Sequence, residues 1–461
     1  MRLICMSFAL CPLLAAGQVW EKSLSPGIVY RMEVDTSTPL VVNAIRFARD
    51  AGVPRAVPGL SQGTVFGADD DKKGRDVLTK TIEREGALAG INGDFFPWTG
   101  DPLGTMVSAG DLLSRPFPGR SVFAWGKNYS TVSRLKWSAT ASYEGQQGIK
   151  IDGLNESCGK DMTVLNTGYA GYALSEAKSF HAILEFPNTL SPSGTWKAKV
   201  IATVKDETRV PVGKDQVVLT ATGKAMEKFQ FLAKGEIVEL KMDTSGVDWT
   251  KADNVIGGGP VIVSAGKAIQ AWDAEDFNGE FANKRHPRSA VGSTKEGDIW
   301  FVQVEGRQAL SAGVTIQELA NIMVKLGCQE ALNLDGGGSS EIALTGMVVN
   351  RPSDGAERPI ANAVLFFGDI QAPNKDEDFV IQGRAKLQQG AATDYKVIDS
   401  QGRALPNSKV IWAASGQGWI DQGGRLRGLQ AGKSTIRAWY EGRVVTLDVT
   451  IEAPPSNPGG R

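Results

Sequence analysis

The sequence predicts an α+β protein, in which a β-rich domain that contains one βαβ unit is followed by a small all-β sandwich. Three observations predict this class. The chain has 461 residues and 54 glycines, a composition that favours many turns and short strands over a helical bundle. One strand–helix–strand pattern covers residues 299–334. Short alternating strands separated by glycine turns cover residues 379–453.

The strand–helix–strand pattern begins with the apolar strand 299–304 and ends with the strand 331–334. Between them, Thr315 and Glu318 form a capping box, in which each side chain bonds a free N–H at the start of a helix. We expect the helix to join two parallel strands through a right-handed crossover. Such a unit would bring the polar residues that follow each strand to the same end of the sheet.

The N-terminus has the pattern of a secretory signal peptide. Arg2 precedes a mostly apolar run over residues 3–14, and small residues follow up to Gly17. We predict cleavage near Gly17 and a secreted protein that is extracellular or periplasmic. The run is too short to span a bilayer, and no later stretch approaches about 20 apolar residues, so no membrane span is expected.

The net charge and the number of histidines limit which partners and cofactors the chain is expected to bind. The net charge of −1 gives no basic footprint for nucleic acid, so no nucleic-acid partner is predicted. The chain has two histidines, His181 and His286, which excludes a His-rich zinc site. We therefore predict no cofactor. A calcium ion held by carboxylates and carbonyls remains open.

Two cysteines, Cys158 and Cys328, remain once the signal peptide is removed. Export to an oxidising compartment favours a disulfide between them, and we predict that bond. The alternative is two buried free thiols, which behave as small apolar side chains.

The predicted organisation has five parts. These are a signal peptide over residues 1–17, a main domain over 18–369, a linker over 370–378, an all-β sandwich over 379–453 and a disordered tail over 454–461.

The polar motifs of the main domain follow predicted strands. Residues 331–334 run into Asp335, three glycines and two serines, and residues 87–91 run into Asn92 in the same way. Glycine lets a ligand approach the bare backbone, and successive N–H groups in such a turn can attract an anion. The alternative is an ordinary strand-ending turn in which Asp335 bonds its own backbone.

Five motifs follow one another in the main domain: Ile91–Phe96, Gly257–Pro260, His286–Gly292, Glu305–Gln308 and Asn333–Ser340. In this order they resemble the motifs of the phosphodiester glycosidases, the family of the N-acetylglucosamine-1-phosphodiester alpha-N-acetylglucosaminidase catalytic domain. The resemblance covers about residues 27–369. Asp94 and Ser289 depart from it, because the family often has Gly and Thr at these positions. Residues 379–453 resemble a bacterial immunoglobulin-like group 2 domain.

The resemblance and the residue chemistry together predict the site. Catalytic roles are assigned to Asp335, Arg288, Asn92 and Glu357. Substrate and phosphate binding are assigned to Arg307, Gly336, Gly337, Gly338, Ser339, Ser340, His286, Asp94 and Gly93.

The expected reaction explains these roles. Hydrolysis between a sugar C1 and a phosphodiester oxygen needs anion binding, stabilisation of an oxocarbenium-like centre, and an activated water or carboxylate nucleophile. Asp335 is the expected nucleophile or general base, with Glu357 as a candidate second carboxylate. Arg288 and Arg307 would grip the phosphate in bidentate fashion. His286 is either a proton carrier or a hydrogen-bonded structural residue.

We therefore predict a secreted hydrolase, a phosphodiester glycosidase that acts on a glycosyl-1-phosphodiester in a glycan or exported polymer. The alternative is a non-catalytic secreted protein that binds glycans or mediates adhesion. Product analysis separates the two.

Overall fold

The computed structural model describes residues 17–49, 55–67, 74–187, 189–370 and 378–454. The predicted signal peptide, linker and tail lie, apart from their boundary residues, outside the described residues. In the described part of the chain the protein is almost entirely β, with 37 strands and only three α-helices. The predicted α+β class is therefore wrong.

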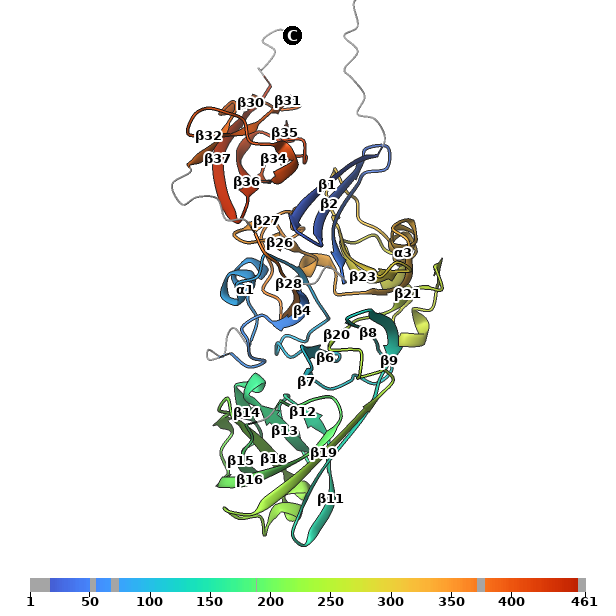
Figure 1. The fold of residues 1–461 in the computed structure, drawn as a ribbon, viewed down its shortest axis with the longest axis vertical. Coiled ribbons are helices and arrows are strands. Elements are labelled where there is room, and N and C mark those ends of the chain that lie inside the picture. Colours follow the sequence, from blue (N-terminus) through green and yellow to red (C-terminus); the bar gives the residue numbers. More distant parts are fainter. Residues whose placement is uncertain (1–16, 50–54, 68–73, 188, 371–377, 455–461) are drawn as a thin grey trace, which may run out of the picture.

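Two antiparallel sheets form the centre of the molecule (Figure 1). Side chains such as Tyr30, Phe301 and Phe366 fill the space between the sheets and make one buried core. The first sheet has the order β1 (Gln18–Ser25), β2 (Ile28–Asp35), β3 (Leu40–Ala48), β24 (Asp298–Val304), β23 (Arg288–Thr294), β25 (Cys328–Asn333), β21 (Val261–Ser264) and β22 (Lys267–Ala268). The second has the order β27 (Met347–Val348), β26 (Ile342–Leu344), β5 (Ala89–Asn92), β28 (Asn362–Phe367) and β4 (Arg55–Leu60).

One helix covers the outer face of each central sheet. Helix α3 (Ile316–Lys325) packs Leu319 and Met323 against the first sheet, and its start has the predicted capping box of Thr315 and Glu318. Helix α1 (Leu78–Glu85) buries Leu78 and Ile82 against the second sheet. The short helix α2 (Gly279–Asn283) precedes β23.

The predicted βαβ unit is absent, because β24 and β25 do not pair with each other. Strand β23 lies between them and is antiparallel to both. The two outer strands consequently still run in the same direction. The end of β24, the end of β25 and the beginning of β23 therefore meet at one edge of the sheet.

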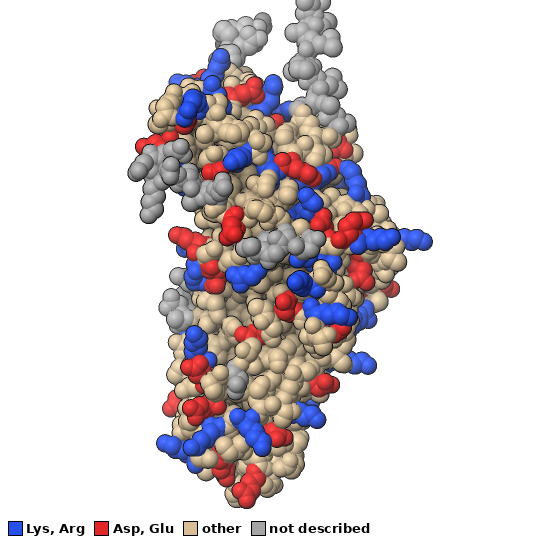
Figure 2. Space-filling model, in the orientation of Figure 1, with Lys and Arg blue, Asp and Glu red and all other residues tan. Residues whose placement is uncertain are grey.

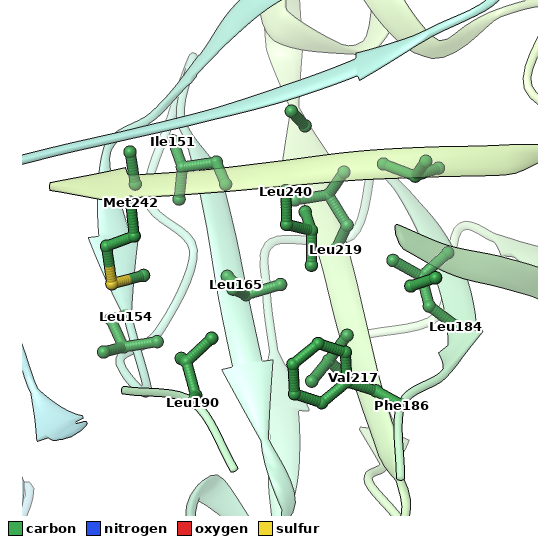
Figure 3. Close-up of a cluster of buried hydrophobic side chains, with 14 of the residues drawn as sticks. Ile151, Leu154, Leu165, Leu184, Phe186, Leu190, Val217, Leu219, Leu240 and Met242 are labelled. Carbon is green, nitrogen blue, oxygen red and sulfur yellow. The ribbon is translucent and has the colours of Figure 1, made fainter. Parts of the chain in front are cut away.

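A second unit lies below the central sheets in Figure 1 and has its own apolar core, drawn in Figure 3. Leu165, Leu219 and Leu240 from three of its strands point toward one another there. Its eight-stranded sheet has the order β11 (Gln146–Ile151), β10 (Lys136–Tyr143), β19 (Ile237–Ser245), β16 (Gly194–Lys205), β15 (Ser179–Glu185), β18 (Gln216–Thr222), β13 (Thr163–Thr167) and β12 (Gly153–Leu154). A five-stranded sheet borders it, with the order β7 (Asp111–Ser114), β6 (Met106–Ser108), β20 (Asn254–Gly257), β8 (Ser121–Gly126) and β9 (Tyr129–Arg134). Strands β14 (Tyr172–Leu174) and β17 (Arg209–Pro211) form a separate pair.

The predicted disulfide is not formed. Cys158 and Cys328 are both free and buried. The Cys158 thiol lies in the second unit, 3.4 Å from the Met162 main-chain oxygen, whereas Cys328 starts β25 and joins the core under α3. Cys328 belongs to the core under α3, whereas Cys158 is bonded within the second unit, so the two thiols lie in different parts of the fold.

The C-terminal unit consists of three small sheets around its own core. Its strands are β29 (Phe379–Gln382), β30 (Lys386–Gln388), β31 (Ala392–Asp394), β32 (Lys396–Asp399), β33 (Val410–Gly416), β34 (Gly418–Ile420), β35 (Arg425–Gly428), β36 (Gly432–Tyr440) and β37 (Arg443–Glu452). Its resemblance to an immunoglobulin-like domain stays a prediction.

The C-terminal unit is packed against the N-terminal hairpin. Ile411 and Trp439 join the central core, with Trp20 packed against the same cluster. Lys22 is 4% exposed and donates to the main-chain oxygens of Val410 and Gln422. Burial lowers the pKa of Lys22 to about 7. Apolar side chains and a buried amine therefore join the two units.

Candidate active site

Four strand ends bring the predicted site residues together. Asp335 lies two residues beyond β25, and Asp94 lies two residues beyond β5 of the facing sheet. Arg288 is the first residue of β23, and Arg307 follows β24. The Asp335 N–H donates to the Gly93 main-chain oxygen over 3.0 Å, which joins the two sheets at this point.

The glycine turn is shaped for close contact with arginine side chains. Gly337 has φ of +63°, in the left-handed region. A Cβ at Gly337 would lie 3.2 Å from the Arg307 Nη2 atom, and a Cβ at Gly338 would overlap Arg358 and Asp354. Glycines are needed here because these side chains lie directly over the backbone.

Most N–H groups of this turn are already bonded within the protein. The Gly336 N–H donates to Asp335 Oδ1 over 2.8 Å, and the Gly337 N–H donates to the Pro287 oxygen over 2.9 Å. The Ser339 and Ser340 N–H groups donate to the oxygens of Gly336 and Gly337, which form the 3₁₀ turn η4 (Gly337–Ser339). The arginines, rather than an open nest of N–H groups, are therefore the anion-binding groups of this structure.

Asp335 is half-buried and has a raised pKa of about 6. Burial is the main cause, because it disfavours the charged carboxylate. Hydrogen bonds from the Ser339 hydroxyl and the Gly336 N–H, and the positive charge of Arg358, oppose the shift. At neutral pH this carboxylate is ionised and basic enough to act as a general base.

Asp94 is 4% exposed, and its pKa is raised to about 7. Burial is again the main cause, and the negative charge of Asp335 adds to it. Its two oxygens accept the N–H groups of Phe95 and Gly104, each over 2.7 Å. Arg120 opposes the shift. Asp94 therefore lies next to the Gly93 oxygen that holds the Asp335 N–H, and the negative charge of Asp335 adds slightly to its raised pKa.

Arg288 is a buried cation held by main-chain oxygens. Its guanidinium donates to Phe281 O over 2.5 Å and to Lys284 O over 3.1 Å, and it lies 4.5 Å from the Phe281 ring centroid. In the described part of the chain no carboxylate forms an ion pair with it. Burial, with a smaller contribution from Arg307, lowers its pKa to about 10. A buried cation without a counter-ion favours a bound anion.

Arg307 lies beside His286. Its backbone has a φ of +61°, and its Nη2 donates to His286 Nδ1 over 3.2 Å. His286 therefore carries its proton on Nε2 in this arrangement. Burial and then the charges of Arg288, Arg307 and Lys284 lower the pKa of His286. The neutral ring fits a site with excess positive charge.

Two residues that were not predicted from the sequence, Asp354 and Arg358, complete the group. Asp354 Oδ2 accepts from Arg358 Nε over 3.0 Å and Nη2 over 2.6 Å, and Asp354 Oδ1 lies 4.0 Å from Arg307 Nη1. Asp354 therefore places an internal anion between two arginines, above Gly338. Arg358 directly follows Glu357, which the sequence did single out, whereas no pattern in the sequence marks Asp354.

Asn92 is a positioning residue. It is 1% exposed, and its Nδ2 donates to the Asp335 main-chain oxygen over 2.7 Å. Its Oδ1 accepts from the Ser289 hydroxyl over 2.7 Å and the Glu341 N–H over 3.1 Å. Ser340 continues this network through a 2.9 Å contact with Ser289. Asn92 and Ser340 thus form a buried hydrogen-bond network that positions Asp335 relative to β23.

Glu357 lies at the start of helix α1 and is bonded there. Its Oε2 accepts the Thr79 hydroxyl over 2.5 Å. Burial raises its pKa. Glu341 is fully buried, and its pKa is raised to about 9 by burial and then by Glu357, while the Arg358 backbone N–H and charge oppose the shift. The sequence did not single out Glu341, because nothing in its neighbours reveals this burial.

No three His, Cys, Asp or Glu side chains converge on a possible metal position in the described residues. None of the described helices is long and apolar enough to cross a membrane. On the face drawn in Figure 2, positive and negative side chains are interspersed.

Residues 195–367 match the family model of the phosphodiester glycosidases. This range contains Arg288, Arg307 and Asp335 and begins after Asn92 and Asp94. The fold is shared with crystal structures of a protein from Synechocystis (TM-score 0.62, 21% identity, 77% of this chain and 64% of that one) and of a protein from Burkholderia pseudomallei K96243 (TM-score 0.61, 19% identity, 77% of this chain and 97% of that one).

Two curated proteins show similarity over short segments. The SPbeta prophage-derived uncharacterized protein YomE of Bacillus subtilis (strain 168) is 36% identical over 96 residues, which are 21% of this chain and 14% of YomE. The N-acetylglucosamine-1-phosphodiester alpha-N-acetylglucosaminidase of Bos taurus is 32% identical over 113 residues, which are 24% of this chain and 20% of the bovine protein. The chain spans a fifth or less of the length of these relatives. What the comparisons show is similarity to the phosphodiester glycosidases, which the family model places at residues 195–367.

Proposed function

We propose that this protein hydrolyses the sugar C1–O bond of a glycosyl-1-phosphodiester. The observation that carries the proposal is the pair Arg288 and Arg307, which lies at the same sheet edge as Asp335, with Asp94 on the adjoining strand end of the facing sheet. A phosphodiester supplies the anion that Arg288 lacks in the described residues and that Arg307 has only in Asp354, 4.0 Å away. Its anomeric carbon supplies the developing positive charge that a carboxylate stabilises.

The proposed reaction has one bond broken and one formed at C1. In one route Asp335 removes a proton from the water that attacks C1, and the C1–O electron pair leaves with the phosphate oxygen. In the other route Asp335 attacks C1 and expels the phosphate, and water then attacks C1 and cleaves the glycosyl–Asp335 ester. The products are the free sugar and a phosphomonoester. Arg288 and Arg307 hold the phosphate as it gains charge. Because a phosphate is a stable leaving group, the step needs little general-acid assistance.

Hydrolysis in ¹⁸O-labelled water tests this proposal directly. The purified protein is incubated with a panel of glycosyl-1-phosphodiesters, and the products are separated by mass spectrometry. Cleavage at C1 places the label on the sugar. Label on the phosphate would mean P–O cleavage and would contradict the proposal. Binding without turnover of any diester would favour the non-catalytic glycan-binding alternative.

Export and metal independence are part of the same proposal. The N-terminal sequence supports cleavage of a signal peptide near Gly17, and N-terminal sequencing of protein recovered from the secreted fraction tests it.

In the proposed reaction no metal ion is needed, because Asp335 provides the negative charge at C1 and the arginines provide the positive charge at the phosphate. Turnover should therefore survive dialysis against EDTA and EGTA, and a loss restored by calcium would contradict this view.

A further inference from the structure

We propose that the cleft between the main domain and the C-terminal unit binds an anionic group of a longer substrate, a glycan with more than one phosphodiester linkage. This inference rests on the proposed function and extends it to a substrate class. It also gives the C-terminal unit a part in substrate binding.

The cleft has a volume of about 530 Å³ and two walls. Asn350, Arg351 and Glu357 contribute to the wall of the main domain. Ser415, Gln417 and Arg437 contribute to the wall of the C-terminal unit. A cleft of this size, lined by polar groups from two units, suits an extended hydrophilic ligand.

The charge of the cleft favours an anion. Arg351 Nη2 donates to the Gly416 main-chain oxygen over 2.8 Å, and Arg437 Nη1 donates to the Ser415 hydroxyl over 2.9 Å. Neither guanidinium has an ion-pair partner in the described residues. The acid in the cleft, Glu357, is already bonded to Thr79 and has a raised pKa. Two cations with neutral partners are thus available to a phosphate.

The cleft and the catalytic group share one loop. Residues 350–352 and 355–357 line the cleft. Asp354 and Arg358, which belong to the same loop, lie over Gly338 of the glycine turn. A chain held at the arginines of the active site therefore needs to cross only this loop to reach the cleft.

The far wall is held in place by burial. Ile411 and Trp439 belong to the central core, and Lys22 is bonded to Val410 and Gln422. Arg437 lies on β36, the strand that carries Trp439. The cleft is therefore a fixed feature of the fold, and a ligand would bind it without first bringing the two units together.

The experiment compares two synthetic substrates on the full chain. One has a single sugar-1-phosphodiester linkage, and the other has three such linkages in series. We expect the wild-type protein to prefer the three-linkage substrate, and Arg437→Gln to reduce this preference in kcat/KM by about three- to tenfold, mainly through KM. Arg403→Gln is the matched control, because Arg403 is exposed on the same unit and pairs with Asp399. It should leave the preference unchanged.

Equal effects of Arg437→Gln on both substrates, or no wild-type preference, would overturn the inference. Arg437→Glu provides a second variant that should reduce the preference further, and melting curves show that each variant is folded. If neither substrate is turned over, the proposed function fails. The affinities of the protein for the one-linkage and three-linkage molecules, measured by calorimetry, then test the inference. Tighter wild-type binding of the longer one, weakened by Arg437→Gln, would still support it, whereas equal or absent binding would refute it.

Discussion

Asn92 donates its side-chain Nδ2–H to the main-chain oxygen of Asp335 over 2.7 Å. The other end of the same amide accepts from Ser289 and Glu341, so one buried side chain ties β5 to β23 and to the glycine turn. The position of the Asp335 carboxylate therefore depends on a residue more than 240 positions away in the chain.

We predict that Asn92→Ala lowers both activity and stability. The change leaves buried donors and an acceptor without partners, at a cost of about 1–3 kcal/mol for each unsatisfied group. Turnover should fall about 10- to 100-fold, because Asp335 is no longer held. Denaturant unfolding and initial rates measure both effects. Normal stability with lost turnover would instead indicate that Asn92 contacts the substrate.

The two arginines should respond differently to replacement by lysine. Arg288 is 2% exposed and bonds three main-chain oxygens, so Arg288→Lys should weaken phosphodiester binding and also lower the melting temperature. The side chain of Arg307 is 42% exposed, so Arg307→Lys should raise KM and leave the melting temperature almost unchanged. An uncharged aryl glycoside serves as the control substrate, and a matching loss of its turnover would argue against phosphate binding.

The activity should have a bell-shaped dependence on pH. The pKa of Asp335 is raised to about 6, so kcat/KM should rise as pH increases through that value and the carboxylate ionises. The pKa of Asp94 is raised to about 7, and its ionisation adds a second negative charge that repels the diester, so activity should fall above that pH. In Asp94→Asn the alkaline limb should disappear. An alkaline limb that persists in this variant would assign it to another group.

Asp354 should compete with the substrate for the arginines. Its carboxylate is bonded to Arg358 and lies near Arg307, where the phosphate is expected. We predict that Asp354→Asn increases the affinity for inorganic phosphate about threefold or more, because an anionic competitor is removed. Isothermal calorimetry with phosphate measures this change. Weaker phosphate binding in the variant would show that Asp354 orders the site and does not compete for it.

The sequence shows which polar residues end or begin strands, but it does not show how the strands are ordered. Polar residues that end or begin strands are visible in the motifs, and Arg288, Arg307 and Asp335 do lie at one edge. The order of strands is not visible, because apolar periodicity marks a strand without naming its neighbours. In the structure β23 lies between β24 and β25, so the sheet is antiparallel here and the expected βαβ unit is not formed.

The other differences between prediction and structure involve residues that are far apart in the sequence. The disulfide was predicted from compartment and cysteine number, but Cys158 lies in the second unit and Cys328 in the core under α3, and no local pattern in the sequence shows this separation. Asp354 and Arg358 belong to a loop that folds over the glycine turn, and Glu341 is buried near that loop. Their neighbours in the sequence do not show these contacts. The contact of the C-terminal unit with Lys22 likewise joins residues almost 400 positions apart.

The most direct test of the proposed mechanism is kcat/KM of Asp335→Asn beside its melting curve. The amide keeps the shape of the side chain and can still accept the Gly336 N–H, but it cannot act as a base or nucleophile. We predict a fall of about two to three decades in turnover, several kcal/mol of transition-state stabilisation, with little change in melting temperature. Near-normal turnover of a folded Asp335→Asn protein would contradict the assignment of Asp335 as the catalytic carboxylate.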